Sequence, residues 1–504
     1  MRGIRHQRFT LALASGYIAL LSTVGYSFFL VPLSLAHVSL GVLGLWFLGL
    51  QACRYLELVD LGISGASLRL VSQAKFNPEE YGKTLSATWL VQASQGLMIA
   101  GVGWLGSEEL ARLLVTGPEN QKQLAEFIFW VFVLNGLRFG LRVFPNLLRV
   151  NQLQHLLNLL TCLGILANLG VLAAALVGGV GSSSFLWGFF AEWVVQVFGP
   201  PILVASRPGL PHRLRLGYPG RSELQALFRF GFAVFQMNSL RFLLESAPLI
   251  LAGRFFGPES SALWSILIRA GTCLRDLLAQ IHISAAPAFY DLLANGERMR
   301  MNQAFTRLSA VSLSLGAALM VMFTAWDSSF VMLWTSGKCL APAHLPALLA
   351  LILWLQICNV WSAEASLCLF RTKPMALAFL QELLVFCVVF AIFGRFGLVE
   401  LAASSLLASL ASSLPRGLIL MRELWDTGAL SQRLVVLFAR GVVTLGFLWL
   451  AARGFQAWVP PVDLHSFASG VLLCSPLALA GWTWWLGPSW LVGLARGLPR
   501  ESRG

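Results

Sequence analysis

FTLALASGYIALLSTVGYSFFLVPLSLA, residues Phe9 to Ala36, contains no charged side chain. The hydrocarbon core of a bilayer is about 30 Å thick, and a helix crosses it with roughly 20 apolar residues. This stretch is therefore long enough to span a membrane. It follows a basic start, MRGIRHQR, but is longer than the apolar region of a signal peptide. We expect a retained first helix that begins in the cytoplasm.

The composition extends this interpretation to the whole chain. Of the 504 residues, 57% are hydrophobic and only 12% are charged, whereas a soluble domain carries about 25% charged residues. The mean hydropathy is +0.73. The apolar runs are continuous and do not alternate with polar residues, which argues against a membrane β-barrel. We therefore predict an all-α polytopic membrane protein.

Polar breaks divide the chain into about fourteen predicted spans. They cover residues 9–36, 39–60, 84–106, 126–145, 156–178, 185–205, 226–251, 261–283, 308–326, 346–369, 376–394, 398–420, 435–452 and 466–486. With the N-terminus inside, inner segments hold twenty-three basic residues and outer segments hold six. Cytoplasmic loops of membrane proteins carry an excess of Lys and Arg. The asymmetry therefore indicates that the loops are assigned to the correct sides of the membrane, which favours fourteen or another even number of spans. We expect both termini in the cytoplasm.

The other features of the composition indicate no cofactor, metal or nucleic acid. The net charge of +13 comes from residues scattered among short loops, and no basic arm or aromatic-interleaved patch is present. Seven of the eight cysteines lie inside apolar runs, and none has the spacing of a metal ligand. No nucleotide-binding loop, zinc motif or serine-hydrolase motif occurs, so we predict no catalytic residues and no enzyme activity.

A repeat indicates that the chain has two halves. PLSLAHVSLG at Pro32–Gly41 and PLILAGRFFG at Pro248–Gly257 share the string P-L-x-L-A-x-x-x-x-G, each at the outer end of the first span of its half. The same number of residues leads from each proline to Asp60 and to Asp276. This correspondence favours a parallel duplication, although coincidence among common residues remains the alternative. We expect each aspartate to hold an elbow where its half pivots.

The residues around these positions resemble a known family. FFLVPL, LGVLGLWFL and RYLELVDLGISGASLRLVSQAK in the first half, and RFGFAVFQMNSLRFLLESAPLILAGRFFGPESSALWSI in the second, are similar to Wzx-type polysaccharide (O-antigen) flippases. These flippases belong to the MOP superfamily, together with the MATE exporters and lipid II flippases. The resemblance is strongest over residues 31–75 and 227–275.

The resemblance implies two six-helix lobes around a central cavity, followed by two further helices. The corresponding boundaries are 1–206 for the N-terminal lobe, 207–225 for a basic cytoplasmic linker, 226–422 for the C-terminal lobe and 423–504 for the last helices and tail. Such a protein moves undecaprenyl-diphosphate-linked oligosaccharide from the cytoplasmic to the periplasmic leaflet of the bacterial inner membrane by alternating access. Its expected partners are this lipid, membrane lipids and other polysaccharide assembly proteins, and we expect a monomer.

Several arginines lie at membrane depth, where each costs at least about 2.5 kcal/mol unless it faces the bundle interior or water. A diphosphate would pair with such guanidinium groups. The resemblance implies cavity arginines on the first, second and eighth helices. Our substrate-binding candidates are Arg54, Arg241, Arg269, Arg275 and Arg138. The alternative is ion pairing within a helix, which the spacings Arg241 to Glu245 and Arg54 to Glu57 both allow.

Acidic side chains at similar depth are candidates for coupling or gating. They are Glu57, Asp60, Glu245, Asp276, Glu192 and Glu364. A solitary carboxylate in the membrane is protonated or paired, so these groups could couple transport to protons or sodium. The simpler interpretation for each is a hydrogen bond to a neighbouring helix.

Two other functions remain open. A MATE-like drug or cation exporter would need an acidic cavity, which the membrane-depth arginines disfavour. A membrane-embedded polysaccharide polymerase or ligase would need reactive groups in a large outer loop, and the longest candidates, residues 107–125 and 327–346, offer only a lone His344.

Overall fold

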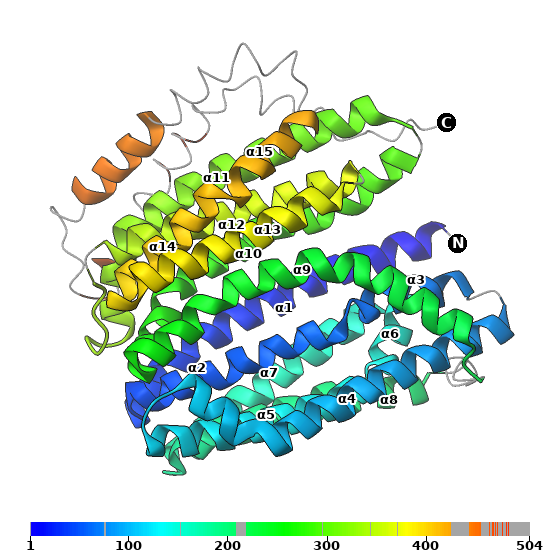
Figure 1. Cartoon of the computed structure of the whole chain (residues 1–504), viewed down its shortest axis with the longest axis horizontal. Coiled ribbons are helices and arrows are strands. Elements are labelled where there is room, and N and C mark those ends of the chain that lie inside the picture. The colour runs from blue at the N-terminus through cyan, green and yellow to red at the C-terminus, as the bar shows by residue number, and fades with distance from the viewer. Residues whose placement is uncertain are drawn as a thin grey trace. The chain divides into compact units, whose positions relative to one another are not determined.

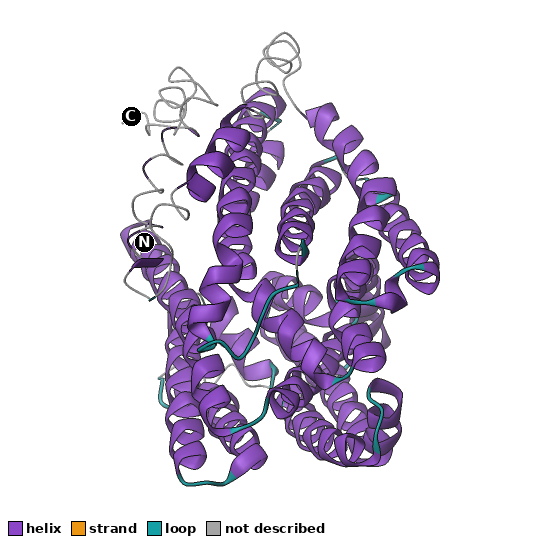
Figure 2. Cartoon of the chain, turned by 90° about the vertical axis from the view of Figure 1, so that its left-hand side faces the viewer, coloured by secondary structure: helices purple, strands orange, loops and turns teal. Residues whose placement is uncertain are grey.

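The structure is a computed structural model. It describes residues 2–74, 77–151, 153–207, 218–294, 296–342, 344–369, 371–424 and 443–454, and isolated residues between 463 and 482. All regular elements in these ranges are helices (Figures 1 and 2). The helices form two compact units, Met1–Ala262 and Leu263–Gly504, called unit 1 and unit 2 below.

The described ranges of unit 1 contain nine complete α-helices and two short 3-10 segments. They are α1 (Arg2–His37), α2 (Leu40–Arg54), η1 (Tyr55–Asp60), α3 (Ile63–Ala74), α4 (Pro78–Leu114), α5 (Pro118–Gly140), α6 (Val143–Val150), α7 (Gln154–Val177), η2 (Gly181–Ser183), α8 (Ser184–Ala205) and α9 (Arg221–Phe256). Neighbours in the chain pair closely, α4 with α5 and α7 with α8 (Figure 1).

Helix α10 (Pro258–Ala294) begins in unit 1 and continues into unit 2. The other main helices of unit 2 are α11 (Arg298–Trp334), α12 (Leu345–Cys368), α13 (Thr372–Ile392), α14 (Leu398–Ala411) and α15 (Ser413–Leu424). A further apolar helix covers Val443–Gly454.

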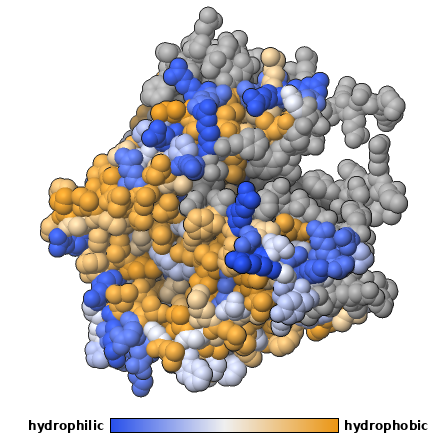
Figure 3. Space-filling view, turned by 45° about the vertical axis from the view of Figure 1, so that its right-hand side comes forward, coloured by the Kyte–Doolittle hydropathy of each residue, from blue (hydrophilic) through white to orange (hydrophobic). Residues whose placement is uncertain are grey.

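The prediction of an all-α polytopic membrane protein is confirmed. Eight described helical segments are long and apolar enough to cross a membrane, and the bent pair α5 and α6 makes a ninth. Each of the first twelve predicted spans lies on one helix or on two consecutive helices. The thirteenth overlaps Val443–Gly454, and most of the fourteenth lies outside the described residues. Apolar side chains cover most of the described surface on the face in Figure 3, as lipid contact requires.

Small residues let the helices of unit 1 pack closely. A Cβ added to Gly96 of α4 would lie 2.4 Å from the carbonyl oxygen of Gly136 on α5, and a Cβ on Gly136 would lie 2.6 Å from the oxygen of Gly96. Side chains at these positions would force the helices apart. Close backbone approach through glycine is a common packing mode for helices in membranes.

The helices that follow the two repeated strings meet each other in unit 1. Both contain the turn between two helices: α1 continues past Pro32 to His37, and α9 continues past Pro248 to Phe256. A Cβ on Gly44 of α2 would lie only 1.8 Å from the oxygen of Pro258 at the start of α10. The Ser261 hydroxyl donates to the Gly44 oxygen at 3.3 Å. The start of α10 is thus fixed against α2.

Helix α9 belongs to unit 1 by its contacts, because it packs on α2, α3 and α4. A Cβ on Gly253 of α9 would lie 2.6 Å from the Leu48 side chain of α2. The sequence places this helix at the start of the second lobe. Most of the expected linker, 208–217, lies outside the described residues, and the division into six-helix lobes stays a prediction.

Candidate functional site

The chain turns sharply between α2 and α3, at the end of the stretch RYLELVD. Leu61 and Gly62 have positive φ angles of 50° and 73°. Asp60, just before them, accepts a hydrogen bond at Oδ2 from the backbone N–H of Ser64 at 3.1 Å and one at Oδ1 from the Ser64 hydroxyl at 2.6 Å. The Asp60 carboxylate therefore caps the start of α3.

Arg142 forms an ion pair with the Asp60 carboxylate at this turn. Its Nη1 lies 3.2 Å from Oδ1 of Asp60, and the two side chains are only 19% and 12% exposed. The guanidinium also lies 3.5 Å from the centre of the Phe139 ring. The pair could not be predicted from the sequence, because 82 residues separate Asp60 from Arg142.

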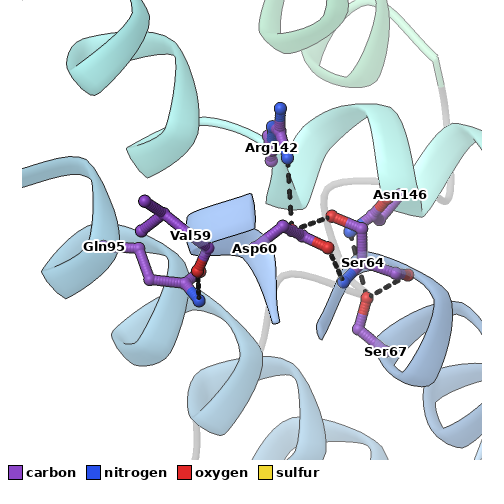
Figure 4. A network of polar contacts seen from close by, with 7 residues as sticks. All are labelled: Val59, Asp60, Ser64, Ser67, Gln95, Arg142 and Asn146. Atoms are coloured by element: carbon purple, nitrogen blue, oxygen red, sulfur yellow. Dashed lines mark hydrogen bonds and ion pairs between the residues drawn. The ribbon is translucent and has the colours of Figure 1, made fainter. Parts of the chain in front are cut away.

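Further hydrogen bonds tie the turn to two other helices (Figure 4). Gln95 of α4 donates to the oxygen of Val59 at 2.6 Å. Asn146 of α6 donates to the Ser67 hydroxyl at 3.2 Å, and this hydroxyl donates to the oxygen of Ser64 at 2.9 Å. The expected elbow at Asp60 is therefore present, and its geometry is fixed by α3, α4 and α6 together.

The corresponding elbow in the second half is absent, so that expectation is wrong. Helix α10 runs without a break through Asp276. Asp276 instead accepts from Nε and Nη2 of the adjacent Arg275, at 3.0 and 2.9 Å. An unbroken helix satisfies its own backbone there and needs no capping carboxylate.

Arg54 ends α2 and has an exposed side chain. Its guanidinium carbon lies 5.4 Å from the centre of the Phe242 ring on α9, and the ring of Tyr55 meets the same phenyl ring edge to face at 5.5 Å. The Glu57 side chain lies outside the described residues, so its pairing with Arg54 stays a prediction.

The ion pair between Arg241 and Glu245, considered above as the alternative to substrate binding, is present. Nε of Arg241 lies 3.4 Å from Oε1 of Glu245, with side chains 35% and 25% exposed. The spacing of four residues on α9 was enough to predict this contact.

Arg275 of unit 2 is held by two neighbouring side chains. Beyond its contact with Asp276, Nη1 donates at 2.5 Å to the side-chain oxygen of Gln356 on α12. Its side chain is 19% exposed. Arg269 is half-buried six residues earlier on the same helix, about 9 Å along the axis.

Glu364 pairs with a histidine that the sequence analysis missed. Its Oε2 lies 2.8 Å from Nε2 of His282, and the Glu364 side chain is 2% exposed. The Cys368 thiol faces the other oxygen at 3.7 Å. The His282 ring also meets Trp361 edge to face at 5.7 Å. A lone histidine within a predicted span was the available signal.

Glu192 of α8 also takes the simpler role that we considered for the acids. It accepts hydrogen bonds from Asn168 of α7 at 2.8 Å and from Gln196 at 2.7 Å. The hydroxyl of Tyr26 on α1 lies 3.3 Å from the Asn168 oxygen. Glu192 and Glu364 thus both form the expected cross-helix contacts.

Arg138, the remaining substrate-binding candidate, lies in the last turn of α5.

The candidates lie on both units: Arg54, Arg138 and Arg241 on unit 1, and Arg269 and Arg275 on unit 2. Within unit 1 the structure brings Arg54 to α9, which also carries Arg241. A single cavity lined by all five arginines stays a prediction.

Neither a comparison with protein-family models nor one with curated proteins finds a match for this sequence. Solved structures do match. The inward closed lipid II flippase MurJ is similar with a TM-score of 0.67 and 12% identity, over 95% of this chain and 99% of that chain.

Transporters of the MATE family are similar over a shorter part. An inward-facing multidrug resistance MATE transporter of the MOP superfamily matches 81% of this chain and 98% of its own, with a TM-score of 0.62 and 12% identity. The Vibrio cholerae MATE transporter VcmN matches 84% and 97%, with a TM-score of 0.56 and 16% identity. This chain is therefore a multi-pass membrane protein with the fold of MOP-superfamily transporters.

Proposed function

We propose that this protein is a flippase that moves an undecaprenyl-diphosphate-linked oligosaccharide, of the O-antigen repeat-unit type, from the cytoplasmic to the periplasmic leaflet by alternating access. In this proposal it lies in the bacterial inner membrane with both termini in the cytoplasm. The observation that supports the substrate class is the presence of arginines held in place on the membrane helices of both units.

The physical reason is the cost of moving a diphosphate through hydrocarbon. An arginine at bilayer depth costs at least about 2.5 kcal/mol and is kept only where it faces protein or water. Arg275 is oriented by Gln356 and Asp276. The contact of Arg54 with Phe242 is to the face of a ring and uses none of its N–H donors. Guanidinium groups placed in this way can donate bidentate hydrogen bonds to the oxygens of a diphosphate.

The acids fit a coupling role in the same proposal. Glu364 is almost fully buried, and its contact with His282 provides two groups that can share or release one proton. A proton bound there would change the charge inside unit 2 during transport. Asp60 and Glu245 are each paired with an arginine, so a change in either pair could accompany a conformational change.

The test is transport of a fluorescent undecaprenyl-diphosphate oligosaccharide in proteoliposomes. We expect wild type to move the lipid, and Arg54→Ala and Arg275→Ala to slow it about tenfold or more each, because each loses a charged hydrogen-bonding group worth about 1.5–3 kcal/mol. Arg112→Ala is the matched control, since Arg112 is exposed and pairs locally with Glu108 and Glu109.

The exporter alternative gives an opposite result in the same vesicles. The likeness to MATE transporters supports testing organic cations in parallel. If wild type expels a cationic dye and moves no diphosphate lipid, the flippase proposal is wrong. Equal rates for wild type and both arginine variants would also reject the assigned residues.

A further inference from the structure

Unit 1 contains a polar cavity of about 320 Å³ beside the bend between α5 and α6. The two helices meet at 47°, and the break leaves space that α7 and α8 close from the other side. Its volume corresponds to about ten water molecules, which is enough for a phosphate or diphosphate group. Three of the lining side chains are arginines, Arg138, Arg142 and Arg149.

The charged side chains that line this cavity among the described residues are the three arginines. Two acids lie next to the lining: Asp60 contacts Arg142, and Glu192 is hydrogen-bonded to the lining residue Gln196. Such a cavity attracts anions, and the effect is stronger where water is partly excluded.

The neutral polar groups of the lining are already used within the protein. The Ser64 hydroxyl donates to Asp60, the Thr161 hydroxyl donates to the oxygen of Leu157, and Gln196 donates to Glu192. Arg149 is exposed and has no ion-pair partner among the described residues. The arginines are therefore the groups that would recognise a ligand.

The position of the cavity along the helices fits a lipid headgroup. Thr161 lies seven residues after Gln154, where α7 begins, and Gln196 lies nine residues before Ala205, where α8 ends. At 1.5 Å per residue these are about 10 and 14 Å from that end of the helices. This depth is near the boundary between headgroups and hydrocarbon. Because Arg138 and Arg149 are exposed, the cavity is open to its surroundings.

We propose that this cavity binds the phosphate or diphosphate group of a ligand at this end of unit 1. Arginine suits this role because its planar fork binds two phosphate oxygens at once. Arg142 is held by Asp60 and by the Phe139 ring, so it is oriented before the ligand arrives. The site does not depend on the proposed transport activity, and its test measures binding alone.

The experiment uses the full-length protein in a neutral detergent, with bound lipid measured by native mass spectrometry. The probes are phosphatidylglycerol, undecaprenyl diphosphate, inorganic diphosphate and a neutral glucosyl diacylglycerol. We expect the phosphate-bearing probes to bind and the neutral glycolipid not to bind. Arg138→Gln and Arg149→Gln should each weaken binding about tenfold, while Arg112→Gln should match wild type. Affinity should also fall as salt is raised.

The probes distinguish the possible sources of the phosphate. Competition by inorganic diphosphate at the same affinity as the lipids would show that the anion alone is recognised. Binding of the lipids without such competition would assign the site to a lipid headgroup.

Other outcomes would overturn the assignment. The proposal is wrong if the neutral glycolipid binds as well as phosphatidylglycerol, or if the Arg138→Gln/Arg149→Gln double variant binds like wild type. Melting curves without ligand check folding, and Arg149→Lys, which keeps the charge but not the fork, should give an intermediate affinity. Arg54→Gln and Arg275→Gln should leave the binding of phosphatidylglycerol unchanged, so loss of transport and loss of this site are separable.

Discussion

The turn between α2 and α3 depends on one carboxylate, and replacing it should destabilise unit 1 in a graded way. Asp60→Ala removes both the cap of α3 and the partner of Arg142. Loss of a helix cap costs about 0.5–2 kcal/mol. Removal of one partner of a buried pair costs about 3–5 kcal/mol, and we reduce this to about 1–3 because Arg142 is 19% exposed and keeps its ring contact.

The total for Asp60→Ala is therefore about 1.5–5 kcal/mol, by the cap and ion-pair values above. For a unit of this size each kcal/mol lowers the melting temperature by about 2–4 °C. We expect a decrease of roughly 3–20 °C for Asp60→Ala and a smaller one for Asp60→Asn, which can still accept from Ser64. Thermal unfolding in detergent, followed by fluorescence, measures both.

A double-mutant cycle with Arg142→Met isolates the ion pair. Its coupling energy should be about 1–3 kcal/mol, because Arg142→Met leaves the cap intact. Glu79→Gln is the matched control, since Glu79 forms an exposed pair with Lys83 at 2.6 Å, and it should leave the melting temperature close to that of wild type. A wild-type melting temperature for Asp60→Ala, or a coupling energy near zero, would refute the assignment.

Two further changes test the packing of each unit. Gly44→Ala should destabilise unit 1 by about 1–3 kcal/mol, since its Cβ would lie 1.8 Å from a backbone oxygen. The control Gly25→Ala, whose Cβ would have nothing within 4 Å, should stabilise α1 by about 0.5–1 kcal/mol. The same change in melting temperature for both variants would contradict the contact at Gly44. In unit 2, His282→Leu leaves Glu364 buried without this partner and should cost about 3–5 kcal/mol. His282→Gln can still donate and should cost clearly less, so equal melting temperatures for the two variants would show that the contact has no structural role.

Local features of the chain were predictable because their causes are local. The helical spans follow from apolar length alone, since a helix is the simplest way to satisfy the backbone in hydrocarbon. Arg241 and Glu245 meet because residues four apart share one face of a helix. The turns after Pro32 and Pro248 were marked by their shared string.

Contacts between distant segments were not predictable in this way. Asp60 and Arg142, and likewise His282 and Glu364, are separated by 82 residues, and no helical period connects them. An elbow at Asp60 was predicted, but the left-handed backbone of Leu61, with φ of 50°, was not, because leucine rarely adopts this conformation. Hydropathy measures transfer from water and does not detect a backbone angle.

The sequence by itself thus determined that this protein is a helical membrane protein and which of its helices are apolar and long enough to cross a bilayer. Only the tertiary structure decided which charges are paired across helices and which lie around one cavity. Arg142 and Glu364 gain partners from other helices, whereas the bend between α5 and α6 gathers three arginines around one cavity. The reason is physical: transfer free energies depend on the residues of one segment, but pairing depends on how separate segments pack.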